Sequence, residues 1–217
     1  MNLEYYKISN SIEEKIVGKE YPQVDCLTQA QAHKISAWHM YNKVQVLKFE
    51  LNKKAKLTDV LSDVSLSGST GLLINKKVRS IFEDFKLMNH QYFEAIVITP
   101  QNEEISYSWL HLTDPSLINK VDFEKSTFFR TEYTFREEEI ELSSFDHYKS
   151  MKAKDSDASF GIEMDEIALS NSFDKSIEVF TFLPFDNQIY ISANLNKTLV
   201  ENNISGVNLE KASNFIW

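Results

Sequence analysis

Residues 71–95 read GLLINKKVRSIFEDFKLMNHQYFEA, and residues 189–212 read IYISANLNKTLVENNISGVNLEKA. Both stretches begin with a few apolar residues, pass through a small polar residue into an amphipathic segment, and end with a second apolar stretch. The small polar residues are Asn75 and Ser192, whose side chains can cap a helix by accepting hydrogen bonds from its first backbone N–H groups. Each stretch therefore predicts a strand, a capped helix and a second strand.

The apolar positions of the two expected helices also correspond. One helical stripe at the spacing i, i+3, i+4 and i+7 is made by Val78, Ile81, Phe82 and Phe85. In the second stretch Leu195 takes the place of Val78. Leu199 takes the place of Phe82, and Gly206 stands near the point where a glycine would end the helix. Because every matching position is apolar or capping, the repeat predicts architecture rather than chemistry.

The rest of the chain is expected to add mainly strands. Residues 92–98 and 105–112 predict an antiparallel hairpin, and residues 143–154 predict a helix with Ser or Asp caps. Thr58 or Asp59 is expected to cap a short helical turn. Short strands are also expected within residues 43–51, 121–135, 162–169 and 177–182.

The expected fold class is α+β, with mostly antiparallel sheet and a few amphipathic helices. The repeat raises the further option of two related strand–helix–strand halves. Residues 1–217 are expected to form a single domain, with a division into two subdomains near residue 125 left open.

The composition excludes several classes of partner. The chain has 32 acidic and 23 basic residues and a net charge of −9. Nucleic acids and anionic membranes need a surplus of Lys and Arg, so neither is expected as a partner, whereas a basic protein is. No apolar run is long enough to span a bilayer, and the N-terminus does not resemble a signal peptide. The single cysteine, Cys26, excludes an internal disulfide and favours a reducing compartment, so we expect a cytoplasmic protein.

A search for catalytic and metal-binding motifs gives no convincing match. The five histidines do not form a His-Glu-x-x-His pattern, and Cys26 is expected to be a small buried residue rather than a nucleophile. Oxygen-bearing residues fall at positions 1, 3, 5 and 12 of a calcium-binding loop: Asp155, Asp157, Ser159 and Glu166. The required glycine at position 6 is replaced by Phe160. No catalytic residue, metal site or cofactor is therefore predicted.

A run of acidic residues is the best candidate for a partner contact. It contains Glu137, Glu138, Glu139 and Glu141. Like charges at this density repel one another, and a basic partner would relieve that repulsion. The alternative is a solvated strand or loop edge with no partner.

Three blocks of the sequence resemble a bacterial family of immunity proteins from polymorphic-toxin systems, immunity protein family eleven. The first block, LTDVLSDVSLSGSTGLLINKKVRSIFEDFKL, precedes SYSWLHL and VDFEKSTFF in the second. The third block is FDKSIEVFTFLPFDNQIYISANLNKTLVENNISGVNLEKA. Together they lie within residues 55–212 and leave the first fifty residues largely unmatched.

The resemblance implies a protein that binds and neutralises a toxin and needs neither catalysis nor a cofactor. It supplies no residues that could be carried over as toxin contacts. Two alternatives remain open: a small-molecule-processing enzyme with a site around Trp109, His111 and Glu104, and a structural adaptor.

Overall fold

The computed structural model describes residues 4–66, 68–133, 135–154 and 159–216. It is an α+β fold with mostly antiparallel strands, which confirms the expected class. The chain divides into two compact units. Unit 1 comprises residues 1–114, 176–180 and 189–211, and unit 2 comprises residues 115–175, 181–188 and 212–217.

The larger sheet of unit 1 has six strands in the order β2-β3-β6-β7-β5-β4. Their bounds are Val24–Cys26 (β2), Leu47–Leu51 (β3), Val60–Leu61 (β4), Thr70–Asn75 (β5), His90–Ile98 (β6) and Glu104–Leu112 (β7). β3 and β6 run parallel, and the other neighbours run antiparallel. The hairpin expected from residues 92–98 and 105–112 is confirmed as β6 and β7.

A second sheet has the order β12-β13-β1-β14. Its strands are Val179–Phe182 (β12), Asp186–Ser192 (β13), Tyr5–Asn10 (β1) and Val207–Lys211 (β14). Residues 181–188 of β12 and β13 and of the turn between them are assigned to unit 2. Two single-turn helices complete the N-terminal part of unit 1, namely Glu14–Val17 (α1) and Gln29–Ala32 (α2).

The two sheets repeat one arrangement of strands and helix. In the first, β5 leads into α3 (Lys76–Glu83) and then β6, and β7 lies antiparallel between β5 and β6. In the second, β13 leads into α5 (Ala193–Glu201) and then β14, and β1 lies antiparallel between β13 and β14. β4 lies outside β5, as β12 lies outside β13. The two halves differ in the source of the middle strand, which follows β6 in the first half but comes from the N-terminus in the second.

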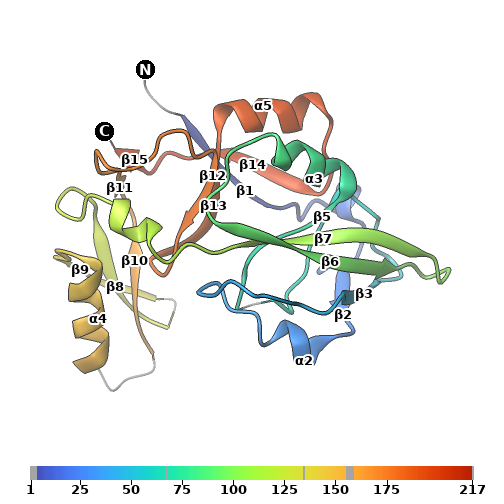
Figure 1. The fold of residues 1–217 in the computed structure, drawn as a ribbon, viewed down its shortest axis with the longest axis horizontal. Coiled ribbons are helices and arrows are strands. Elements are labelled where there is room, and N and C mark those ends of the chain that lie inside the picture. The colour runs from blue at the N-terminus through green and yellow to red at the C-terminus, as the bar shows by residue number, and fades with distance from the viewer. Residues whose placement is uncertain (1–3, 67, 134, 155–158, 217) are drawn as a thin grey trace. The chain divides into compact units, whose positions relative to one another are not determined.

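The capping and apolar residues that define the repeat have the expected roles. The Asn75 side chain accepts a hydrogen bond from Val78 N–H at 3.0 Å. Ser192 Oγ accepts one from Leu195 N–H at 3.1 Å. The corresponding stripe positions are fully buried, with 0% exposure at Val78, Phe82, Leu195 and Leu199. Ile81 and Phe85 of the expected first stripe are only half-buried, and Phe85 lies beyond the end of α3. The two helices contact each other, and Figure 1 shows α3 and α5 next to one another.

The expectation for Gly206 needs correction. α5 ends at Glu201, and Asn203 adopts the left-handed conformation (φ 51°) that ends the helix. Gly206 lies further along the chain, at φ 84°. A Cβ atom there would lie 2.0 Å from the Val60 carbonyl oxygen. Gly206 is therefore required by the close approach of two backbone segments rather than by the helix end.

One local expectation is confirmed and another is wrong. Residues 43–51 contain the expected short strand, which covers Leu47–Leu51 and buries Leu47, Phe49 and Leu51. No helical turn follows Thr58, because the next element is β4. The Asp59 carboxylate instead accepts hydrogen bonds from Asn75 Nδ2 at 2.8 Å and from Ser205 N–H and Oγ–H at 2.8 and 2.7 Å. Asp59 therefore connects the cap of α3 to the segment after α5.

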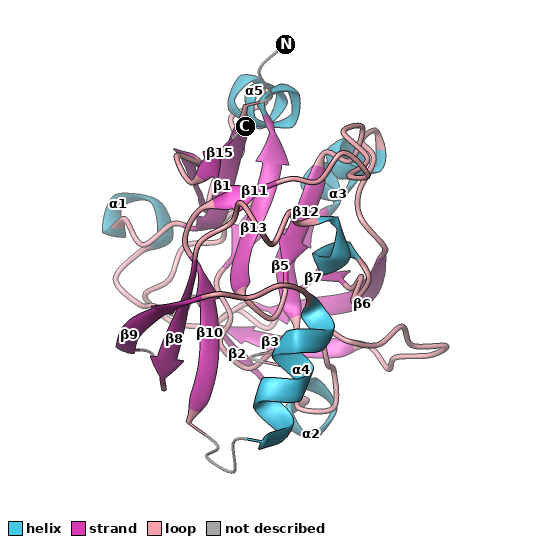
Figure 2. Ribbon diagram, turned by 90° about the vertical axis from the view of Figure 1, so that its left-hand side faces the viewer, coloured by secondary structure: helices cyan, strands magenta, loops and turns pink. Residues whose placement is uncertain are grey.

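Unit 2 contains a three-stranded antiparallel sheet in the order β10-β8-β9. Figure 2 shows these strands side by side, with β9 at the outer edge. The bounds are Phe128–Glu132 (β8), Phe135–Ile140 (β9) and Phe160–Met164 (β10). A parallel pair and a 3-10 turn complete the unit, namely Ile167–Ala168 (β11), Phe215–Ile216 (β15) and Leu117–Lys120 (η1).

The helix expected within residues 143–154 is confirmed as α4 (Phe145–Lys154). Ser144 Oγ accepts a hydrogen bond from His147 N–H at 3.1 Å at its N-terminus. α4 packs through aromatic rings, because Phe185 contacts Phe145 and Tyr148 of the helix edge-on at 6.1 and 4.9 Å between centroids. Phe185 also contacts Phe128 of β8 at 5.4 Å, so one buried ring joins the helix to the sheet.

Candidate functional site

The acidic run lies mainly on β9, the edge strand of the unit 2 sheet, and all residues from Phe135 to Glu139 are exposed. Two of its neighbours already have partners. Arg130 Nε lies 3.3 Å from a Glu137 carboxylate oxygen. Arg136 donates to Glu163 at 2.8 Å and to Asp165 at 2.7 Å. The hydrogen bonds that Arg136 donates to these carboxylates raise the pKa of its guanidinium, which stays charged.

The other three acids of the run differ from Glu137. Glu138, Glu139 and Glu141 are exposed, and no hydrogen bond or ion pair of their side chains is found within the described ranges of the chain. The pairing of β9 with β8 is interrupted by a bulge, which lies opposite the β8 segment between Phe129 and Thr131. Bulges and charges are devices that keep a sheet edge from pairing with a second copy. The same charges leave the edge electrostatically suited to a basic surface.

The residues of the alternative enzyme site are only partly brought together. Trp109 and His111 lie on β7 and share a partner, Ser69, in the loop before β5. Ser69 Oγ lies 2.8 Å from His111 Nδ1, and it accepts a hydrogen bond from Trp109 Nε1–H at 3.0 Å. Glu104 begins β7 and pairs with Ile98, whereas His111 pairs with Gly71 near the other end of the strand. Ser69 was not a sequence candidate, because nothing in the pattern links it to a residue 42 positions away.

His111 is buried with 0% exposure and has partners on both ring nitrogens. Its Nε2 lies 3.0 Å from the His39 carbonyl oxygen, which can only accept, so Nε2 carries the proton. The ring stacks on Phe93 at 5.1 Å and meets Tyr41 edge-on at 5.9 Å between centroids. Burial lowers the pKa of His111, although the hydrogen bond to His39 opposes this, and the imidazole is neutral at pH 7.

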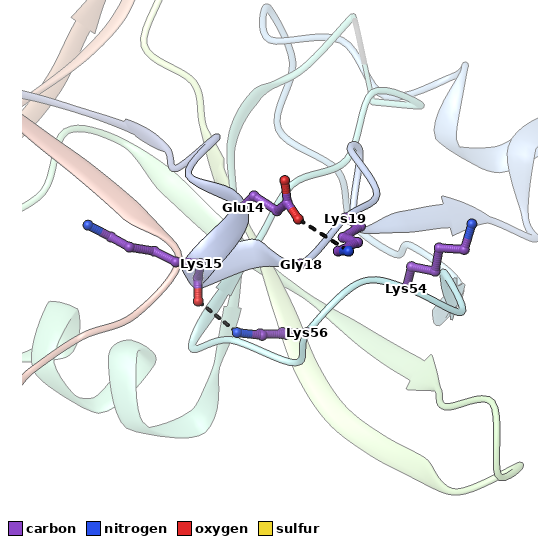
Figure 3. Close-up of a pocket in the computed structure, with 6 residues that line it drawn as sticks. All are labelled: Glu14, Lys15, Gly18, Lys19, Lys54 and Lys56. Carbon is purple, nitrogen blue, oxygen red and sulfur yellow. Dashed lines mark hydrogen bonds and ion pairs between the residues drawn. The ribbon is translucent and has the colours of Figure 1, made fainter.

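A pocket of about 680 Å³ in unit 1 is lined by six residues, namely Glu14, Lys15, Gly18, Lys19, Lys54 and Lys56 (Figure 3). Its four lysines suggest an anion site, but their ammonium groups do not converge. Lys56 Nζ donates to the Lys15 carbonyl oxygen at 2.7 Å, and Lys19 Nζ lies 3.9 Å from Glu14. Figure 3 shows the Lys15 and Lys54 side chains pointing away from each other. The geometry therefore assigns no anion to this pocket.

Cys26 and the described part of the calcium-like segment, residues 159–166, are held by ordinary structural contacts. Cys26 is buried, and its Sγ lies 3.5 Å from Thr28 Oγ1. Asp155 and Asp157 lie outside the described residues. The segment continues as strand β10, and Glu166 accepts a hydrogen bond from Thr127 at 3.1 Å. Among the residues that the structure describes, no group of three or more His, Cys, Asp or Glu could hold a metal ion.

Comparison with known proteins adds no family. No protein-family model matches the chain, and no curated protein matches it. In the part of the chain that the structure describes, no helix is both long and apolar enough to cross a membrane.

Proposed function

We propose that this chain is a cytoplasmic immunity protein that neutralises a basic toxin domain by binding it, without a catalytic step in that role. The observation that carries this proposal is a group of three exposed acids, with Glu138 and Glu139 on the edge strand β9 and Glu141 just after it. Their side chains have no partner in the described residues. The resemblance of residues 55–212 to the immunity family supports the same proposal.

The physical case rests on electrostatic complementarity. A chain of net charge −9 attracts a basic partner from a distance, and a dense acidic edge orients it on approach. Such an inhibitor needs a rigid complementary surface and no reactive group. The Arg136 contacts with Glu163 and Asp165 hold β9 against β10 across the sheet and so support that surface.

The neighbouring genes and cell survival test this function. We expect the adjacent gene to encode a secreted protein with a toxic C-terminal domain. Cells that express this domain should grow only when they also express the wild-type chain, and the two proteins should co-purify in a 1:1 complex. Survival without the chain, or rescue without a complex, would contradict the proposal.

A matched pair of variants tests the surface. Glu138→Lys/Glu139→Lys should reduce rescue, because it places repelling charges on the edge. Glu103→Lys/Glu104→Lys changes the net charge equally, but at the β6–β7 turn of unit 1, and should rescue like the wild type. Equal rescue by both variants would contradict the assignment of the surface.

A further inference from the structure

The contacts of Ser69 form a chain of hydrogen bonds with a fixed direction. Because the His111 Nε2–H donates to the His39 carbonyl, the neutral ring has a lone pair on Nδ1. The Ser69 hydroxyl, 2.8 Å away, therefore donates to Nδ1. Trp109 Nε1–H in turn donates to Ser69 Oγ at 3.0 Å. A hydroxyl, a neutral imidazole and a third group that orients the imidazole make the arrangement that activates a serine.

The environment of His111 keeps its imidazole neutral, which is the form that can accept a proton. It is fully buried between aromatic rings, and burial keeps its imidazole unprotonated at neutral pH. Its orientation is fixed by the hydrogen bond to the His39 carbonyl and by the stacked ring of Phe93. The Trp109 N–H uses one lone pair of Ser69 Oγ and stabilises negative charge on that oxygen as its proton leaves.

Ser69 differs from its buried partners because its own side chain is only half-buried. The chain beside it is fixed at two points. Ala37 N–H donates to the Gly68 carbonyl at 2.8 Å, and the His39 carbonyl accepts from His111. The residues that alternate with these anchors are exposed apolar side chains, Trp38 at 37% and Met40 at 58%.

We propose that Ser69 is a nucleophile that accepts an acyl group from an ester, with His111 as its base. The Ser69 Oγ–carbon bond forms as the ester C–O bond breaks, and the hydroxyl proton passes to His111 Nδ1 and then to the leaving alkoxide. Water later releases the acyl group as a carboxylic acid and restores the serine. This activity goes beyond the proposed function, since binding a toxin needs no reactive group.

An alkyl fluorophosphonate is the probe for this serine. It should add one phosphonyl group to the full chain as the Oγ–P bond forms, fluoride leaves and His111 takes the proton. Peptide mapping should place the group on Ser69, and Ser69→Ala should show no addition. The labelling rate should be constant above about pH 7 and should decrease at lower pH as His111 is protonated.

Two variants separate activation from a structural role. His111→Gln keeps polar partners for Ser69 and His39 but removes the base, so labelling should be at least about a hundredfold slower. Ser205→Ala is the matched control, because Ser205 is also half-buried but its hydroxyl donates to the Asp59 carboxylate. This variant should label like the wild type.

The labelling experiment tests the proposed nucleophile independently of toxin binding. No adduct on the wild-type chain, an adduct on a serine other than Ser69, or equal labelling of folded His111→Gln would overturn it. If His111→Gln does not fold, the mapped position and the pH profile of the wild type decide alone. A labelling rate proportional to hydroxide concentration through pH 6–9 would show an ordinary serine and overturn the proposal.

Discussion

Phe82 of α3 is one of the large side chains that are completely buried in unit 1. Its side chain has 0% exposure and lies on the stripe that α3 turns towards the interior. The sequence periodicity predicted this burial, because a helical apolar stripe has few alternatives to a protein interior. The prediction succeeded for Leu199 of α5 for the same reason.

Phe82→Ala is expected to lower the free energy of unfolding by about 3–5 kcal/mol, because it removes buried contacts and leaves a cavity. Urea denaturation at pH 7.5 measures the effect. Ile81→Ala, at the half-buried neighbouring position, is the control and should cost less. A loss below about 1 kcal/mol for Phe82→Ala would show that the residue is not in a closed core.

His111 should make the stability of unit 1 depend on pH. Burial lowers its pKa below the ordinary 6.5, so the unfolded chain takes up the proton first as the pH decreases. The stability should be complete above pH 6.5 and should decrease from there until the pH reaches the lowered pKa of the folded state. Urea denaturation between pH 7.5 and 5 should show this decrease. The His111→Gln variant should show a flatter profile, and an unchanged slope in that variant would contradict the assignment.

At the scale of elements, the repeated strand–cap–helix segments were predictable because they are local. Asn75 and Ser192 precede their helices by one residue, and the apolar stripes follow within two turns. Three features were not predictable in this way. The pairing of β1 with β13 and β14 joins distant segments, the buried face of β3 depends on its register, and the Ser69–His111 contact spans 42 residues.

The two caps should differ in strength. Ser192→Ala should cost about 1 kcal/mol through the lost cap of α5. Asn75→Ala should cost more, because Asn75 also donates to the half-buried Asp59 carboxylate at 2.8 Å. Thr198→Ala, at a half-buried position of α5 where the hydroxyl donates only to a carbonyl of the same helix, should change the unfolding free energy by less than about 0.5 kcal/mol.

Thermal or urea unfolding of the three variants tests this order. Equal effects of Asn75→Ala and Thr198→Ala would show that the Asp59 connection does not stabilise the fold. If Ser192→Ala lowers the unfolding free energy no more than Thr198→Ala does, the Ser192 cap of α5 does not stabilise the fold.

At the scale of the whole molecule, charge is the property that the sequence predicts most directly. The net charge of −9 follows from the composition, and the position of the acidic run follows from the order of residues in the sequence. The pairing of β8, β9 and β10 determines that most of the run lies on an edge strand. The same pairing brings Arg130 close to Glu137 and Arg136 close to Glu163. Within the described chain Glu137 lies near Arg130, whereas Glu138, Glu139 and Glu141 have no such partner, so we propose these three as the main contacts with a toxin.

The association rate with the toxin domain tests the central claim most directly. We expect Glu138→Lys/Glu139→Lys to slow association by about tenfold or more at low ionic strength, with little change in folding. The difference from the wild type should shrink as added salt screens the charges. Glu103→Lys/Glu104→Lys, with the same net charge, should associate faster than the edge variant. If the edge variant and the wild type associate at the same rate in low salt, the acidic edge of β9 is not the surface that the toxin recognises.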